Sequence, residues 1–261
     1  GERWGGPRAA PAGLRYRPDF VSPAEEAELL EVIDGRSAAW MRQIRRAQQF
    51  FGVVYYQTTQ SVPELQPTAE SDASAQNGRA LEDLPAWLRE RLRSDGLFGD
   101  SNPLNQVQGN EYLDDSGIGS HVEDPAAGPS VVTLSLLQPI QLTLQRSEGG
   151  RPLHKDVRDN EDCVKVLLEP RSLLVLEGES RWDFAHAIRQ SRLVPLRDGG
   201  TLRRGKDYRR VSLTFRGIAK ELRSAERRDT PEGFAAFDIR AEKAAHAKRQ
   251  VASAGPPSPE E

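Results

Sequence analysis

Apolar residues recur at helical spacing in two segments of the N-terminal third, which predicts two amphipathic helices. The first helix begins at Ser22, because Ser22-Pro23-Ala24-Glu25 combines an N-cap serine, a proline at the first helical position and an acid at the third. Gly35 can end this helix, and the second helix covers 84–93. The two apolar stripes consist of Leu29, Leu30 and Ile33, and of Leu84, Leu88 and Leu92.

From about residue 105 the pattern changes to short β-rich runs that are separated by Gly, Pro, Asp and Asn turns. Several strands without helices between them favour an antiparallel sandwich or jelly roll over a parallel α/β sheet. We therefore predict an α+β protein, a double-stranded β-helix (jelly roll) with flanking N-terminal helices. The predicted strands are Phe51–Gln57, Gln106–Tyr112, Val131–Leu137, Ile140–Leu144, Val164–Leu168, Leu173–Glu177 and Val211–Phe215.

The remaining segments are polar and divide the chain into one domain with two decorated ends. We predict a disordered segment over 1–13, a domain over 14–217 with its jelly-roll core at about 105–217, and a charged, partly helical or disordered tail over 218–261. Three stretches inside the domain have loop or insertion composition, at 66–80, 147–162 and 196–208. The tail has one candidate helix, near 232–250.

Composition and charge narrow the class of protein. The chain has 261 residues, a length that buries a real core, and its single cysteine, Cys163, excludes an intramolecular disulfide. A lone thiol suits a reducing compartment, and we expect a cytoplasmic or nuclear monomer. No apolar run approaches the roughly 20 residues that cross a bilayer, so we expect no membrane span. Because the chain begins with Gly, a targeting segment stays open.

Four histidines supply the candidate chemistry, and two of them stand in informative surroundings. His121 precedes Glu123, and a His-x-acid pair on extended backbone points both side chains to one side. His186, from a distant strand, would complete a face of two histidines and one carboxylate, which non-haem Fe(II) oxygenases use. We expect His154 and His246, in polar surroundings, to be exposed bystanders.

The motifs around these histidines occur in a specific order. Asn110-Glu111-Tyr112 precedes the His-x-acid pair, an apolar strand and a Gly-Glu-Ser-Arg turn precede His186, and Arg210 and Arg216 enclose a final Val-Ser-Leu-Thr-Phe strand. This ordered set resembles the AlkB family of Fe(II)/2-oxoglutarate dioxygenases. The resemblance covers roughly 105–217 well and extends faintly to the two earlier stretches 15–33 and 45–56.

The resemblance implies Fe(II) as cofactor, 2-oxoglutarate and dioxygen as cosubstrates, and a role for each matching residue. His121 and His186 resemble the iron ligands, while Arg210 and Tyr112 match the positions that bind the distal carboxylate of 2-oxoglutarate. Asn110 and Arg216 would approach the end that chelates iron. The residues alone support part of this: Arg210 and Arg216 lie on one face of a strand, and two buried cations need an anion. A surface salt bridge is the alternative reading of Arg216.

The carboxylate ligand departs from the family pattern, which usually has His-x-Asp. This chain has Glu123 at that register and Asp124 one residue later, next to Pro125. Glu is one methylene longer than Asp and still reaches a metal, so we expect Glu123 to be the ligand. Asp124 is the alternative, and a site that turns over slowly or not at all is a third possibility.

The resemblance implies an oxidative demethylase or hydroxylase of modified bases in RNA or DNA, and some relatives act on proteins. A base-processing site needs aromatic side chains on which the extruded base stacks, and Phe50, Tyr55, Tyr56 and Trp182 are candidates. Arg42, Arg45 and Arg46 precede Phe50 and could contact phosphates. The net charge of −3 opposes a nucleic-acid substrate. A dioxygenase of proteins or small molecules, and a weakly active or non-catalytic binding module, remain the alternatives.

Overall fold

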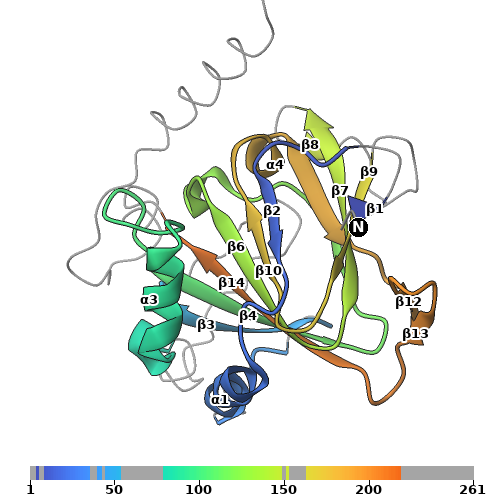
Figure 1. Cartoon of the computed structure of the whole chain (residues 1–261), viewed down its shortest axis with the longest axis horizontal. Helices are drawn as coiled ribbons and strands as arrows, with labels where there is room; N and C mark the ends of the chain where they lie inside the picture. Colours follow the sequence, from blue (N-terminus) through green and yellow to red (C-terminus); the bar gives the residue numbers. More distant parts are fainter. Residues whose placement is uncertain are drawn as a thin grey trace, which may run out of the picture.

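The strands of this protein alternate in side-chain direction, and this alternation gives each sheet two different faces. The computed structural model describes residues 4–5, 9–35, 40–42, 45–53, 79–148, 151–152 and 163–218. The β-rich runs predicted after residue 105 all form strands, and these belong to two six-stranded sheets. The sheets lie face to face (Figure 1), so the predicted jelly roll with flanking N-terminal helices is confirmed.

The first sheet has the strand order β1-β9-β7-β11-β5, and β8 pairs with Ser147 and Glu148 at the end of β7. Its pairings within the described residues are all antiparallel. The strands are β1 (Trp4–Gly5), β5 (Ile118–His121), β7 (Ile140–Glu148), β8 (Arg151–Pro152), β9 (Cys163–Leu168) and β11 (Phe184–Ile188).

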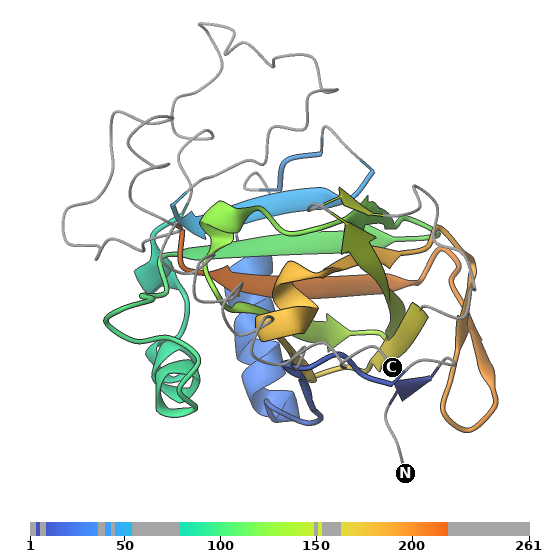
Figure 2. The same ribbon diagram turned by 90° about the horizontal axis from the view of Figure 1, so that it is seen from above.

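The second sheet has the strand order β2-β10-β6-β14-β4-β3 and is also antiparallel. Figure 2 shows β3, β4 and β14 side by side, with α1 beneath them. The strands are β2 (Leu14–Arg17), β3 (Ala47–Gly52), β4 (Gln106–Leu113), β6 (Val131–Leu137), β10 (Leu173–Leu176) and β14 (Arg209–Arg216).

The outer face of the second sheet is apolar and is covered by α1 (Pro23–Asp34) and α3 (Ala86–Ser94). Alternate residues of β14, such as Val211, Leu213 and Phe215, pack there with the leucines of the two predicted stripes. This cluster is the larger of the two hydrophobic cores. A second core lies between the sheets and includes Leu144 and Phe184.

Both predicted helices form, and the first begins where its capping signal places it. Ser22 accepts a hydrogen bond from the Glu25 amide (3.2 Å), and the Glu25 carboxylate accepts one from the Ser22 amide (2.8 Å). This capping box satisfies two amides that have no partner within the helix. Gly35 caps the other end through its amide, which donates to the carbonyl of Glu31 (2.9 Å). The second helix, α3, begins two residues later than predicted, after a 3₁₀ turn over Leu81–Asp83.

Three other predicted segments differ from the structure, and several lie outside the described residues. The segment 1–13, which we predict to be disordered, contains the short strand Trp4–Gly5, which pairs with β9. The polar insertion 196–208 contains β13 (Thr201–Arg203), which forms a hairpin with β12 (Leu193–Pro195). In both places pairing with a neighbouring strand overrides a turn-rich composition.

The strand predicted at 51–57 begins at Ala47 instead, and 54–57 lies outside the described residues. Most of 66–80 and of 147–162 and all of 219–261 also lie outside the described residues, and so do His154 and His246. None of the described helices is long and apolar enough to cross a membrane.

Candidate metal centre

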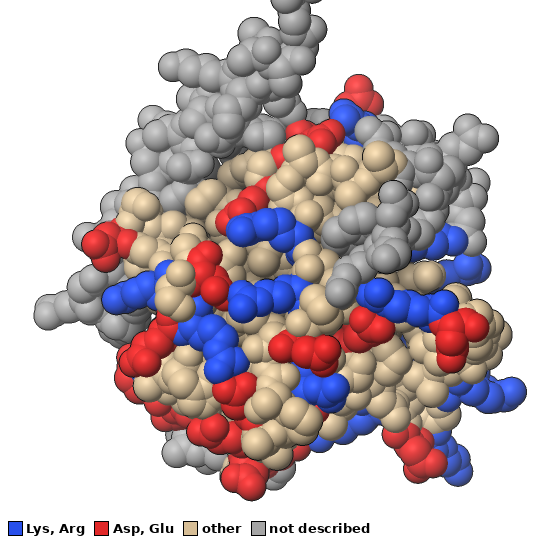
Figure 3. All heavy atoms as spheres, viewed as in Figure 1, with Lys and Arg blue, Asp and Glu red and all other residues tan. Residues whose placement is uncertain are grey.

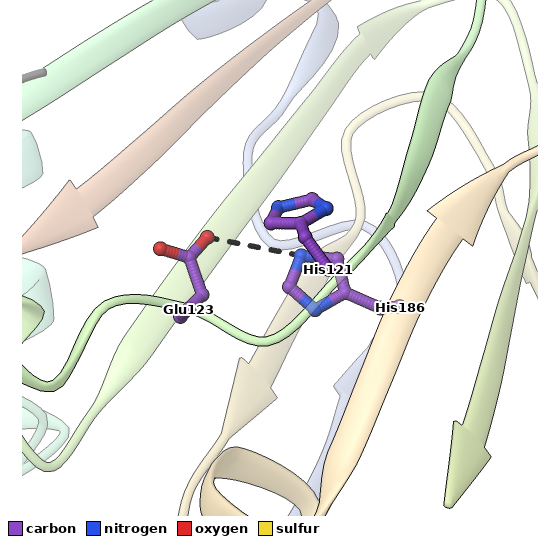
Figure 4. A group of neighbouring side chains, drawn as sticks. All are labelled: His121, Glu123 and His186. Carbon is purple, nitrogen blue, oxygen red and sulfur yellow. Dashed lines mark ion pairs between the residues drawn. The ribbon is translucent and has the colours of Figure 1, made fainter. Parts of the chain in front are cut away.

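Two histidines from neighbouring strands meet on the inner side of the first sheet. His121 ends β5, His186 lies in the middle of β11, and the two residues are direct cross-strand partners. Such partners point to the same face of a sheet. Their ring centroids are therefore 4.3 Å apart (Figure 4).

Glu123 lies in the loop after β5 and turns back toward both imidazoles (Figure 4). One ligand atom from each of His121, Glu123 and His186 lies within 4.8 Å of the other two, and Glu123 Oε1 is 3.7 Å from His186 Nε2. Asp124 has a different role, because its carboxylate accepts a hydrogen bond from the Ala126 amide (2.8 Å) and caps the 3₁₀ turn Pro125–Ala127. The geometry thus groups the histidines with Glu123 and not with Asp124.

The protonation states of these groups suit a metal. Burial, the largest cause, lowers the pKa of His186 to about 3 and also lowers that of His121, so both imidazoles are neutral near pH 7. Burial alone would raise the pKa of Glu123, but the positive charge of Arg216 and interactions with the two histidines hold it below its usual range. Neutral imidazoles and an ionised carboxylate are the forms that bind a cation.

Arg216 holds Glu123 through a two-pronged ion pair. Its Nη2 donates to Glu123 Oε1 (2.9 Å) and its Nε to Oε2 (3.1 Å), while Nη1 donates to Gln108 Oε1 (2.7 Å). The side chain is 11% exposed, so the alternative reading of Arg216 as a surface salt bridge does not describe its position. Arg216 was expected near the iron-chelating end of 2-oxoglutarate. In the structure it instead holds the carboxylate of Glu123, and a fork of parallel donors fixes such a group well.

Arg181 holds the backbone of the same loop from the other side. This buried arginine, in the short helix α4 (Gly178–Trp182), donates to the carbonyls of Glu123 (3.1 Å), Asp124 (2.6 Å) and Gly128 (3.0 Å). Gly128 has a φ of +81°, and a Cβ there would lie 2.8 Å from the carbonyl oxygen of Gly217. Glu123 is therefore fixed through its backbone by Arg181 and through its carboxylate by Arg216.

The inner face of the second sheet is buried yet polar, and it lies across from the metal centre. Asn110, Ser135, Ser212 and Arg210 all lie there, each less than one tenth exposed. Arg210 donates through Nε to Ser135 Oγ (2.9 Å), and its guanidinium carbon lies 5.0 Å from the centroid of the Tyr112 ring. No acid among the described residues pairs with it, and its buried Nη1 has no hydrogen-bond partner. A buried cation without an acidic partner is costly, so this face fits an anionic ligand such as a dicarboxylate.

The other predicted site residues lie near this face or outside the described residues. Tyr112 and Asn110 are on β4, and Phe50 on β3 pairs with Gln108 on the same face. Trp182 ends α4, beneath the Arg181 guanidinium (4.2 Å to the ring centroid). Tyr55 and Tyr56 lie outside the described residues.

Comparison with known proteins agrees with a metal centre of two histidines and one acid inside a jelly roll. The 2OG-Fe(II) oxygenase superfamily profile matches residues 13–216, and the chain belongs to this superfamily of Fe(II)- and 2-oxoglutarate-dependent dioxygenases. Fe(II) and 2-oxoglutarate are accordingly its cofactor and cosubstrate, and dioxygen is the second cosubstrate.

Within the superfamily the chain is AlkB-like. It is 29% identical over 219 residues to an alkylated DNA repair protein ALKBH8 homolog of Arabidopsis thaliana. This match covers 79% of this chain and 58% of the relative. A probable RNA/DNA demethylase ALKBH6 of Danio rerio is 27% identical, and the match covers 83% of this chain and 90% of the relative. The solved structure of OsALKBH1 shares the fold, with a TM-score of 0.51 at 16% identity, over 80% of this chain and all of that one.

The chain spans 32% of a third relative, the tRNA (carboxymethyluridine(34)-5-O)-methyltransferase ALKBH8 of Mus musculus, at 26% identity over 82% of this chain. The chain therefore corresponds to only a part of the first and third relatives.

Sequence reasoning did not assign a role to Ser135, Arg181 or the pairing of Arg216 with Glu123. A signal for Ser135 was present, because Thr133 and Ser135 alternate with apolar residues inside a strand that is otherwise fully apolar. No local pattern announces the roles of Arg181 and Arg216, since their partners are more than 50 residues away in sequence.

Proposed function

We propose that this AlkB-like dioxygenase oxidises alkylated or modified bases in RNA or DNA. The observation that carries the proposal is a group of two histidines and one carboxylate that faces a buried arginine with no acidic partner. The relatives support the polymer, since they are named for DNA repair, RNA/DNA demethylation and tRNA modification. Where the attacked carbon is an N-methyl group, its hydroxylated product releases formaldehyde and leaves the demethylated base.

In this proposal His121, Glu123 and His186 hold Fe(II), which supplies the oxidising chemistry when bound. The neutral imidazoles and the ionised carboxylate need lose no proton near pH 7 before they bind the ion. Arg216 and Arg181 keep Glu123 in place, so the longer acid takes the position that Asp has in the usual family pattern.

The second sheet binds the cosubstrate. Arg210 offers its free Nη1 to the distal carboxylate of 2-oxoglutarate, and Tyr112 and Ser135 line the same place. Asn110, on the next inward position of β4, is expected nearer the end that chelates iron. Burial strengthens each of these interactions and excludes water from the reacting atoms.

The substrate is expected to enter near β3 and α4, where Phe50 and Trp182 are candidate stacking surfaces. The face that carries β2, β10 and α1 is a poor surface for nucleic acid, because basic and acidic side chains interleave over its described part (Figure 3). Many of them are paired, among them Arg15 with Glu177 and Arg17 with Asp95. We further propose a monomer that acts where nucleic acid is found, in the cytoplasm, the nucleus or both.

The test is mass spectrometry of methylated RNA, methylated DNA and methylated peptides after incubation with the protein, Fe(II) and 2-oxoglutarate. We expect loss of a base modification with matching succinate and formaldehyde, and no loss with His186→Ala. Turnover of peptides alone would replace the proposal by a protein-directed dioxygenase. Absence of succinate under every condition would favour a non-catalytic module.

A further inference from the structure

Three arginines lead into the edge strand β3, and two of them are neutralised by acids. Arg42 Nη1 lies 2.9 Å from Glu111 Oε2, and Arg45 Nη2 lies 2.6 Å from Asp115 Oδ1. Arg46 differs, because no carboxylate among the described residues lies within ion-pair distance of it. Its Nε is buried and has no hydrogen-bond partner.

Arg46 belongs to the inner face of the second sheet. Side chains alternate along β3, so Arg46 continues the row of Gln48 and Phe50, while Ala47 packs into the core on the outer side. The guanidinium carbon of Arg46 lies 6.0 Å from the centroid of the Tyr112 ring.

Two guanidiniums therefore approach the ring of Tyr112, one from Arg210 and one from Arg46. The distal end of 2-oxoglutarate carries a single carboxylate, and Arg210 is the deeper and more buried of the two cations. Arg46 is half-buried and precedes an edge strand, so a molecule that enters from solvent can reach it. A desolvated N–H without a partner is destabilising, and a second anion would satisfy it.

We infer that Arg46 binds an anionic oxygen of the substrate, namely a phosphate of the strand beside the nucleotide that enters the site. The inference rests on the proposed function, in which the substrate is RNA or DNA. Arg42 and Arg45 are not assigned this role, because their charges are already compensated within the protein. A guanidinium suits this task because its donors match two phosphate oxygens at once.

The experiment measures how salt weakens binding of a short, fluorescein-labelled single-stranded RNA of mixed sequence, with single-stranded DNA in parallel. Each lost phosphate contact lowers the slope of log K against log salt by about 0.7 for single strands. We expect Arg46→Gln to show this decrease and to weaken RNA binding at low salt about tenfold. Arg46→Lys, which keeps the charge, should retain most of the slope.

Arg17→Gln is the matched control, because it removes the same charge from β2, at the opposite edge of the same sheet. Calorimetry of 2-oxoglutarate binding to the Mn(II)-loaded variants shows whether Arg46 serves the cosubstrate instead. A folded Arg46→Gln protein with the wild-type slope would overturn the inference. A loss of 2-oxoglutarate affinity without a change in RNA binding would also overturn the inference. If the wild type binds neither RNA nor DNA at low salt, the proposed substrate itself is wrong and the inference fails with it.

Discussion

Arg181 and Arg210 are both buried guanidiniums, but their surroundings satisfy them in opposite ways. Arg181 donates to three backbone carbonyls, including that of Glu123. Arg210 donates through Nε to the Ser135 hydroxyl, but its buried Nη1 has no partner among the described residues. The first arrangement is complete without a ligand and positions a loop, whereas the second leaves one donor for the anion that we propose. In this proposal Arg181 is a positioning residue and Arg210 a binding residue, although the two side chains are equally buried.

At this scale we predict that Arg181→Lys weakens metal binding. A lysine ammonium cannot reach three diverging carbonyls as a guanidinium fork does, so the loop that carries Glu123 loses its anchor. Changes to groups that orient metal ligands typically lower metal affinity about 10–100-fold, and we expect the lower end for Mn(II), measured by calorimetry.

Arg146→Lys is the control for that prediction, because Arg146 forms an exposed pair with Glu179. If Arg181→Lys lowers the melting temperature while its Mn(II) affinity stays within about twofold, Arg181 serves folding alone.

At the scale of elements, helix α1 is tied to its neighbours at its first turn. Glu25 closes the capping box and also accepts two hydrogen bonds from Arg91 of α3, one of them 3.1 Å long. These hydrogen bonds lower the pKa of Glu25 to about 2, with those from Arg91 the largest cause. One acid thus fixes both the start of α1 and its packing against α3, beneath the second sheet.

We therefore predict an acid-sensitive contribution of Glu25 to stability. A carboxyl whose pKa is lower in the folded than in the unfolded state stabilises above its unfolded value and loses this effect as pH falls toward the folded value. Here the window runs from the ordinary value of 4.5 down to about 2. Glu25→Gln should lower the free energy of unfolding by about 1 kcal/mol at pH 7, after discounting for partial exposure, and by less as the pH falls below 4.5.

Urea unfolding of the wild type and Glu25→Gln at several pH values checks this prediction. Glu31→Gln, on an exposed position of α1, is the matched control and should change little at any pH. A Glu25→Gln deficit that is the same at pH 7 and at the acid end of the window would show that the ion pair with Arg91 contributes nothing.

At the scale of the whole molecule, the two sheets place a metal centre and an unpaired cation on facing inner surfaces. The first sheet supplies the histidines and the second supplies Arg210. Ligands that bridge the two sheets bind the folded state only, and they therefore stabilise it by mass action. Without them, the buried charge of Arg210 is destabilising, and in the proposed function it serves to bind 2-oxoglutarate.

This predicts the effect of ligands on thermal unfolding. Mn(II) with 2-oxoglutarate at about one hundred times its Kd should stabilise by about 2.7 kcal/mol and raise the Tm by about 5–10 °C. In Arg210→Met the part of the shift that depends on 2-oxoglutarate should disappear, and the free variant should melt at or above the wild-type Tm. A full 2-oxoglutarate-dependent shift in this variant, followed by scanning calorimetry, would contradict the assignment of Arg210.

The sequence by itself determined the features that depend on near neighbours along the chain. Strand alternation, the capping box at Ser22 and the ordered motifs around His121 and His186 are all local, and the structure has strands, a helix and a candidate metal centre there. The tertiary structure decided what depends on partners far apart in sequence. It turned Glu123 rather than Asp124 toward the histidines, paired Arg216 with that glutamate and left Arg46 without an acid among the described residues. Backbone periodicity sets which face a side chain occupies, but strand register and loop path set what it meets there.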